Sequence, residues 1–291
     1  MIAAAGKNLI DLVKQIVLGR IAADRLVLPA MPANATRCIA MVRDPDINMR
    51  QVASTLSRDP MLTAQVLRLA NSAAYAGTGA VKSIDQAVTR VGAQKLKTLL
   101  IEVSARLVFD SRDPRIAEAF RGIWDHSIAV GLLAREVSTL ATGSDPDATY
   151  LAGLLHDVGK PVVAAVLLEA EKTIGAGSAG AWIKHRAWVA AVQETHRTVG
   201  AAIAEKWHLP EAVVSCIRDC HEYDTNERLS TPNVVRFANA LAKKAGVYVG
   251  DVDTEDTDAL VMIGRSLLGL DEDVIERLSR DLPERVKQQM A

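Results

Sequence analysis

His156 and Asp157 are the residues whose types and position in this chain best suit them to chemistry. They follow an apolar run, 150–155, whose periodicity predicts a helix buried in its domain. A buried helix end can hold an imidazole and a carboxylate only if each is hydrogen-bonded, ion-paired or bound to a metal. Gly159 and Pro161 predict that the helix, which we expect over 147–158, ends beside this pair.

The other histidines fall into two groups by their surroundings. His126, His196 and His221 each share an apolar stripe of a predicted helix, so we expect all three to point into the core. His185 lies between basic residues and His208 lies at a helix end, so we expect both to be solvated. Four inward imidazoles and one carboxylate would thus converge from separate helices.

Such a set suits one or two divalent metal ions, and Fe, Mn, Zn and Ni all fit it. Helix-bundle cores are a known place for sites of this kind. Each histidine taken singly also fits a hydrogen-bonded core residue. Lys160 either contacts a phosphate as a point charge or is a solvated cation at a helix end.

The elements that must position these residues are all helices. Apolar residues recur with helical spacing along the chain, and no segment alternates convincingly as a strand. Asn48, Asp59 and Ser83 are predicted N-caps. Further helices are predicted at 115–140, 161–171, 181–207, 210–221 and 231–245.

A polar stretch that contains a proline, 110–114, is the best candidate for a boundary between two lobes. We therefore expect four parts: an amphipathic helix within 1–24, an N-terminal helical lobe at 25–110, a second helical lobe at 111–250, and a tail at 251–291 packed on the second lobe. The tail is predicted to form two helices, at 257–268 and 271–278.

Composition excludes several classes of protein. Of 291 residues 49% are hydrophobic and the net charge is −1, with no basic block, which argues against nucleic-acid and membrane-surface binding. Three cysteines cannot form a disulfide framework, and we expect Cys216 and Cys220 to be core residues rather than zinc ligands. Without a secretory signal or a membrane-spanning run, a cytoplasmic protein is expected.

Several motifs together resemble one family. They are Leu28-Pro-Ala-Met-Pro32, Arg58-Asp-Pro-Met-Leu62, Leu67-Arg-Leu-Ala-Asn71-Ser72, Ile84 to Gly92, Trp124-Asp-His126-Ser127, Gly153-Leu-Leu-His156-Asp157-Val-Gly-Lys160, Glu194-Thr-His196, Val199-Gly-Ala201 and Trp207-His-Leu-Pro210. The chain resembles, over about 25–245, the HDOD (HD-related output domain) family, a branch of the HD superfamily of metal-dependent phosphohydrolases.

The resemblance implies an all-α, two-lobed multi-helix bundle with an HD-like C-terminal lobe. It implies a bacterial, cytoplasmic signal-transduction output or scaffold domain that acts through protein–protein contacts in two-component or cyclic-di-GMP networks. The partners would be of the histidine kinase, response regulator or diguanylate cyclase type, with a nucleotide ligand and a homodimer left open.

By the same resemblance, the metal-site positions are those of the following residues: His126, His156, Asp157, His196, His221 and Asn239. Asn239 stands where the superfamily carries its last metal-binding aspartate, and Glu222 replaces a histidine of the active relatives. Their Gly-Tyr-Pro element is also missing after His221. We therefore expect a catalytically inactive scaffold. The alternative is a metal-dependent phosphohydrolase or phosphodiesterase that acts on a nucleotide and uses Asp157 and Lys160.

Overall fold

The structure is a computed structural model that describes residues 15–16, 19–20, 23, 28–72, 75, 79–142, 145–175 and 185–290, without the side chains of 142, 170–175, 185–187 and 290. These residues form helices, turns and loops, and none of them lies in a β-strand. The amphipathic helix predicted within 1–24 falls almost wholly outside the described residues. The chain divides into two compact units, Ala30–Leu107 and a larger one formed by Val108–Ala291 with Met1–Pro29.

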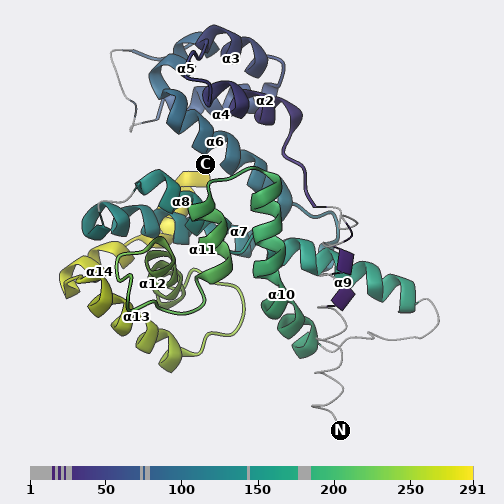
Figure 1. Ribbon diagram of the computed structural model, residues 1–291, viewed down its shortest axis with the longest axis vertical. Coiled ribbons are helices and arrows are strands. Elements are labelled where there is room, and N and C mark those ends of the chain that lie inside the picture. The colour runs from purple at the N-terminus through teal and green to yellow at the C-terminus, as the bar shows by residue number, and fades with distance from the viewer. Residues whose placement is uncertain are drawn as a thin grey trace. The chain divides into compact units, whose positions relative to one another are not determined.

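The smaller unit consists of five short helices (Figure 1). They are α2 (Ala33–Val42), α3 (Met49–Leu56), α4 (Pro60–Ala70), α5 (Ile84–Val91) and α6 (Ala93–Arg106). The predicted N-caps are confirmed, since the side chains of Asn48, Asp59 and Ser83 each accept a hydrogen bond from the first turn of the following helix.

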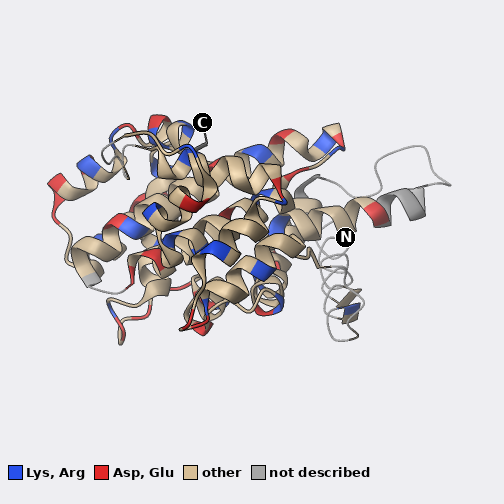
Figure 2. Cartoon of the chain, turned by 90° about the horizontal axis from the view of Figure 1, so that it is seen from above, with Lys and Arg blue, Asp and Glu red and all other residues tan. Residues whose placement is uncertain are grey.

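The 3-10 turn η2 (Leu107–Phe109) lies at the boundary between the units. In the larger unit it is followed by the long helix α7 (Pro114–Val137), which continues as the π-helical turn η3 (Ser138–Thr142). The remaining helices are α8 (Pro146–Leu155), α9 (Gly159–Gly175), α10 (His185–Lys206), α11 (Glu211–Asp219), α12 (Thr231–Lys244), α13 (Thr254–Leu268), α14 (Glu272–Ser279) and α15 (Leu282–Met290). Basic and acidic residues are interspersed along them (Figure 2).

Helix α8 is the centre of this unit. Every residue from Thr149 to Leu155 is buried, and α8 packs against α7, α11 and α12. The stretch Pro146–Glu169 is long and apolar enough to cross a membrane, but 89% of its apolar 18-residue window is buried inside the protein, as expected for a core helix. The predicted interior position of this helix is therefore confirmed.

Two glycines allow helices to approach closely around α8. A Cβ at Gly153 would lie 3.0 Å from the backbone of α7 at Gly131, and a Cβ at Gly159 would lie 1.9 Å from the carbonyl oxygen of His196. Side chains larger than hydrogen at these positions would push the backbones apart. Gly153 thus allows α8 to lie directly against α7, and Gly159 allows the start of α9 to lie directly against α10.

Three boundary predictions need correction. Helix α8 ends at Leu155 rather than at 158, because the chain turns over His156–Val158 before α9 begins. The compact units separate after Leu107, a few residues before the predicted 110–114, because Phe109 is buried against Trp124 of α7. The C-terminal tail contains a third helix, α15, whose Leu282 and Val286 are buried.

Candidate metal centre

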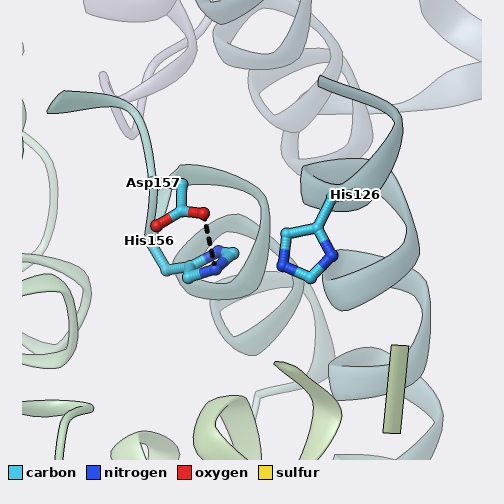
Figure 3. Close-up of side chains that lie close together, drawn as sticks. All are labelled: His126, His156 and Asp157. Atoms are coloured by element: carbon cyan, nitrogen blue, oxygen red, sulfur yellow. Dashed lines mark ion pairs between the residues drawn. The ribbon is translucent and has the colours of Figure 1, made fainter. Parts of the chain in front are cut away.

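Two helices and one turn bring four of the candidate residues together. His126 lies on α7, His156 and Asp157 lie in the turn between α8 and α9, and His196 lies on α10. All four side chains are buried, and none is more than 4% exposed. Figure 3 shows His126 and His156 pointing toward one another from separate elements, with Asp157 beside His156.

The distances within this group are short. The ligand atoms of His126, His156 and Asp157 all lie within 4.8 Å of one another. Nε2 of His156 is 3.3 Å from Oδ2 of Asp157, and Nε2 of His196 is 3.4 Å from its Oδ1. The two carboxylate oxygens therefore each face an imidazole. We call these four residues the His/Asp cluster.

Hydrogen bonds to the backbone fix the orientation of each ring. Nδ1 of His126 lies 2.7 Å from the carbonyl oxygen of Val247, that of His156 lies 2.7 Å from Gly153, and that of His196 lies 2.8 Å from Gln193. An imidazole nitrogen this close to a carbonyl oxygen must carry the proton and donate it. Each neutral ring is then left with a lone pair on Nε2.

These lone pairs give the cluster the chemistry of a metal site. Nε2 of His156 is buried without a hydrogen-bond partner. The Nε2 lone pairs of His156 and His196 face a carboxylate, which is also electron-rich, so a cation between them would satisfy all three groups. Histidine ligands to metals commonly donate their other N–H to a carbonyl, as these three do. The residues present therefore fit a divalent ion.

Burial keeps the rings of His126 and His196 neutral. Burial, together with a smaller effect of the neighbouring His156, lowers the pKa of His126 to about 3. Burial likewise lowers the pKa of His196 to about 4, against the opposing effect of Asp157. Burial would raise the pKa of Asp157, but His156 and Lys160 hold it well below its ordinary range. At neutral pH the cluster thus offers uncharged nitrogens on His126 and His196 and the carboxylate of Asp157.

Lys160 is not the solvated cation that was one of the two expectations from the sequence. It is only 8% exposed, and its Nζ lies 2.6 Å from Oδ2 of Asp157. The prediction of a solvated helix-end cation is wrong because α9 continues through Lys160 into the core of the unit. This ammonium group neutralises part of the charge of the one carboxylate in the His/Asp cluster.

Asn239 lies on α12 with its side-chain Oδ1 3.1 Å from Nε2 of His126. Because Nδ1 of His126 donates to Val247, Nε2 of the neutral ring can only accept, and two acceptors would then face each other. We therefore assign the amide with its oxygen and nitrogen exchanged, so that Asn239 donates an N–H to Nε2. Asn239 gives His126 the partner that a metal ion would otherwise be.

His221 is not part of this group. It is exposed in the turn after α11, and the prediction that it points into the core is wrong. Helix α11 ends at Asp219 with Cys220 as its C-cap, so the helical stripe does not reach His221. His208 is exposed, as predicted, whereas the side chain of His185 is outside the described residues.

Cys216 and Cys220 are both buried, as expected for core residues. The neighbouring Cys216 lowers the pKa of Cys220, and His156 lowers it further. Cys220 and burial raise the pKa of Cys216 well above its ordinary value. The cysteine pair therefore lies within electrostatic reach of the His/Asp cluster.

Sequence reasoning missed the residues that line the cluster on the α12 side. The ring of Tyr248 contacts His126 edge-on at 5.1 Å, and Nζ of Lys243 lies 4.9 Å from the centroid of the same ring. Spacing on α12 could have pointed to Lys243, since it is four residues after Asn239 and so shares its face. Nothing in the sequence predicted Tyr248, which lies in the loop after α12.

The larger unit is thus an all-helical fold in which buried histidines and an aspartate converge from separate elements. The HDOD domain model matches residues 28–223, and the chain belongs to this family. A protein of uncharacterised function from Treponema pallidum (strain Nichols) is 29% identical over 143 residues, which is 48% of this chain and 27% of that protein. The match thus spans about a quarter of the curated relative.

Solved structures share the fold. One from Shewanella amazonensis SB2B, whose name proposes a metal-dependent phosphohydrolase, has a TM-score of 0.72 at 23% identity and covers 98% of this chain and 100% of its own. An HDOD domain protein of unknown function from Geobacter sulfurreducens has a TM-score of 0.62 at 22% identity, and the match covers 97% of this chain and 98% of that protein. A Marinobacter aquaeolei VT8 protein, whose name proposes signal transduction, has a TM-score of 0.63 at 22% identity, with 99% of this chain and 64% of its own covered.

Proposed function

We propose that this protein is a cytoplasmic signalling scaffold in which the His/Asp cluster fixes the packing of the larger unit and does not hydrolyse a substrate. The observation that carries this proposal is the pairing of His126 with the Asn239 amide. Without a carboxylate at this position, Asp157 is the one acid of the cluster, and it already neutralises Lys160 at 2.6 Å.

Charge decides between scaffold and enzyme. A catalytic site with two divalent ions needs several carboxylates to offset the charge of the ions, and one shared aspartate cannot do so. One ion, held by Nε2 of His156 and His196 together with Asp157, is compatible with this charge. Iron, manganese, zinc and nickel all suit such ligands.

The alternative function is a metal-dependent phosphohydrolase or phosphodiesterase that acts on a nucleotide. The partnerless Nε2 of His156 favours it, because a buried lone pair has a use once an ion is bound. A bound divalent ion would supply Lewis acidity toward a phosphoryl group. Asp157 and His156 would hold the ion, and Lys160 would lie beside it as a point charge.

Partners of the scaffold would be signalling proteins of the histidine kinase, response regulator or diguanylate cyclase type. A homodimer is a further possible assembly. The name of the Marinobacter protein is in keeping with a signalling role.

A hydrolysis assay separates the two functions. The purified protein is loaded with Mn²⁺ or Fe²⁺, its metal content is measured, and it is incubated with a cyclic dinucleotide and with bis(p-nitrophenyl) phosphate. We expect no turnover above the rate of the Asp157→Ala variant. Turnover that Asp157→Ala abolishes would overturn the scaffold proposal.

A complementation experiment tests the scaffold directly. A strain that lacks the gene receives either the wild-type chain or Asp157→Asn, with folding of the variant checked by thermal denaturation. We expect a folded Asp157→Asn to restore signalling, because the contacts with partners do not need the metal. A folded variant that fails to restore it would contradict a purely structural role for the cluster.

A further inference from the structure

Three basic residues lie at the edge of the His/Asp cluster. Arg236 and Lys243 share a face of α12 with Asn239, three residues before it and four residues after it. Arg236, Asn239 and Lys243 are each half-buried, so this face is partly open to solvent where the His/Asp cluster itself is closed. Lys160 is the third cation. We call Arg236, Lys243 and Lys160 the basic rim.

Within the basic rim, Lys160 is paired with Asp157, but Arg236 and Lys243 lack the partners that buried cations normally have. Nε of Arg236 is buried without a hydrogen-bond partner, and its guanidinium lies over the ring of Tyr223 at 5.1 Å. Neither Arg236 nor Lys243 makes an ion pair with any residue that the structure describes. Lys243 contacts the ring of Tyr248 instead, and Nζ of Lys160 lies 5.9 Å from the centroid of that ring.

Positive charge exceeds negative charge here. Burial lowers the pKa of Lys243, and the nearby Lys160 lowers it further, while Asp157 and Asp256 act in the opposite direction. Asp157 is already paired with Lys160, and Asp256 is exposed at the start of α13. A bound anion would relieve the repulsion between the cations and give Arg236 a hydrogen-bond acceptor.

We propose that Arg236, Lys243 and Lys160 bind the phosphate group of a small molecule, and that these cations hold it without a metal ion. A guanidinium donates paired hydrogen bonds to phosphate oxygens, and ammonium groups add point charges. This inference rests on the proposed function, since it adds a ligand to a scaffold that does not hydrolyse it. The ring of Tyr248 lies between the ligand position and His126, so binding would be felt at the His/Asp cluster.

The test uses calorimetric titration of the full chain with inorganic pyrophosphate, in EDTA and at low ionic strength. Lys243→Gln is compared with Lys244→Gln, which removes the same charge from the next residue of α12. Lys244 is exposed and pairs with Asp258 at 2.7 Å, outside the basic rim. We expect Lys243→Gln to weaken binding at least about tenfold and Lys244→Gln to leave it nearly unchanged. Arg236→Gln should weaken it independently of Lys243→Gln.

Three results would overturn the basic rim as a binding site. They are no binding by the metal-free wild type, equal losses in Lys243→Gln and Lys244→Gln, and binding that appears only after metal is added and disappears in Asp157→Ala. Thermal denaturation shows whether each variant is folded. If Lys243→Gln does not fold, Arg236→Gln replaces it as the test variant. Turnover of a phosphodiester would contradict the scaffold proposal but not this site, so the two failures are distinguishable.

Discussion

Nε2 of His126 lies 3.1 Å from the side-chain amide of Asn239, and this pairing joins α7 to α12 across the buried cluster. The Nδ1–H of His126 donates to Val247, so both ring nitrogens are satisfied within the protein. His156 differs, since its Nε2 has no hydrogen-bond partner. The cluster thus contains one histidine that needs no metal and one that would gain from it.

Asn239→Asp should convert this pairing into a metal ligand. In the metal-free protein a carboxylate would face the Nε2 lone pair of His126, and we expect a loss of about 1–3 kcal/mol in the free energy of unfolding. Added Mn²⁺ or Zn²⁺ should bind about tenfold more tightly than to wild type and restore the lost stability. Calorimetric titration and thermal denaturation measure both effects. If added metal binds to the wild type and to Asn239→Asp equally tightly and stabilises both equally, position 239 does not contact the ion.

Asp157→Ala should destabilise the metal-free protein by about 3–5 kcal/mol, because it leaves the buried Lys160 without its counter-charge. The double variant Asp157→Ala with Lys160→Met removes both charges, and we expect it to recover much of the loss. Urea unfolding of the wild type, both single variants and the double variant measures the coupling. Additive losses would show that the ion pair does not account for the effect.

The pH dependence follows from the two depressed histidine pKa values. His126 and His196 have folded-state pKa values of about 3 and about 4, below the unfolded value of 6.5. Between pH 6.5 and these folded-state values, the unfolded chain therefore binds more protons than the folded protein. The contribution of the two neutral histidines to the free energy of unfolding is fully present above pH 6.5. It is lost as the pH falls toward 4, by up to about 1.4 kcal/mol per pH unit for each histidine.

Asp157 acts in the same direction at lower pH, because its pKa is also depressed. Urea unfolding of EDTA-treated protein from pH 7.5 to 5 checks this slope. His196→Gln should flatten it, and His208→Gln, at an exposed position, should not. A free energy of unfolding that stays constant over this range would mean that the histidines are not buried in neutral form.

Gly159→Ala should disturb the cluster through the backbone. Its Cβ would meet the carbonyl oxygen of His196 at 1.9 Å and the backbone nitrogen of Gly200 at 2.7 Å, neither of which can move without α10. We expect a loss of about 3 kcal/mol or more and weaker metal binding. Gly200→Ala is the control, because its Cβ would be closest to the side chain of Ile217, at 3.0 Å, and would lie at an ordinary 3.5 Å from the backbone nitrogen of Gly159. Equal losses would show that the close approach of α9 to α10 is not specific.

His221→Gln tests the one predicted ligand that the structure leaves outside. Since His221 is exposed, we expect a change in stability within about 0.5 kcal/mol and unchanged metal affinity. His196→Gln should instead weaken metal binding, because its Nε2 faces Asp157 at 3.4 Å. Reduced metal content in His221→Gln would require the turn after α11 to fold over the cluster.

The sequence by itself determined the helices and much of the cluster. Local patterns settle such features: the caps Asn48, Asp59 and Ser83 act within one turn, and the apolar run before His156 requires burial whatever packs on it. Helical spacing also placed His126 and His196 inside, because both lie well within long helices and share the apolar face that packs into the core.

Only the tertiary structure decided what lies next to what. His221 follows the end of α11, where helical periodicity no longer fixes direction, so its exposure could not be predicted from its spacing. The pairing of Lys160 with Asp157, of Asn239 with His126, and of Tyr248 with both His126 and Lys243 depends on how α7, α9 and α12 pack. These contacts set the charge of the cluster, and charge depends on distances in space that a linear sequence does not contain.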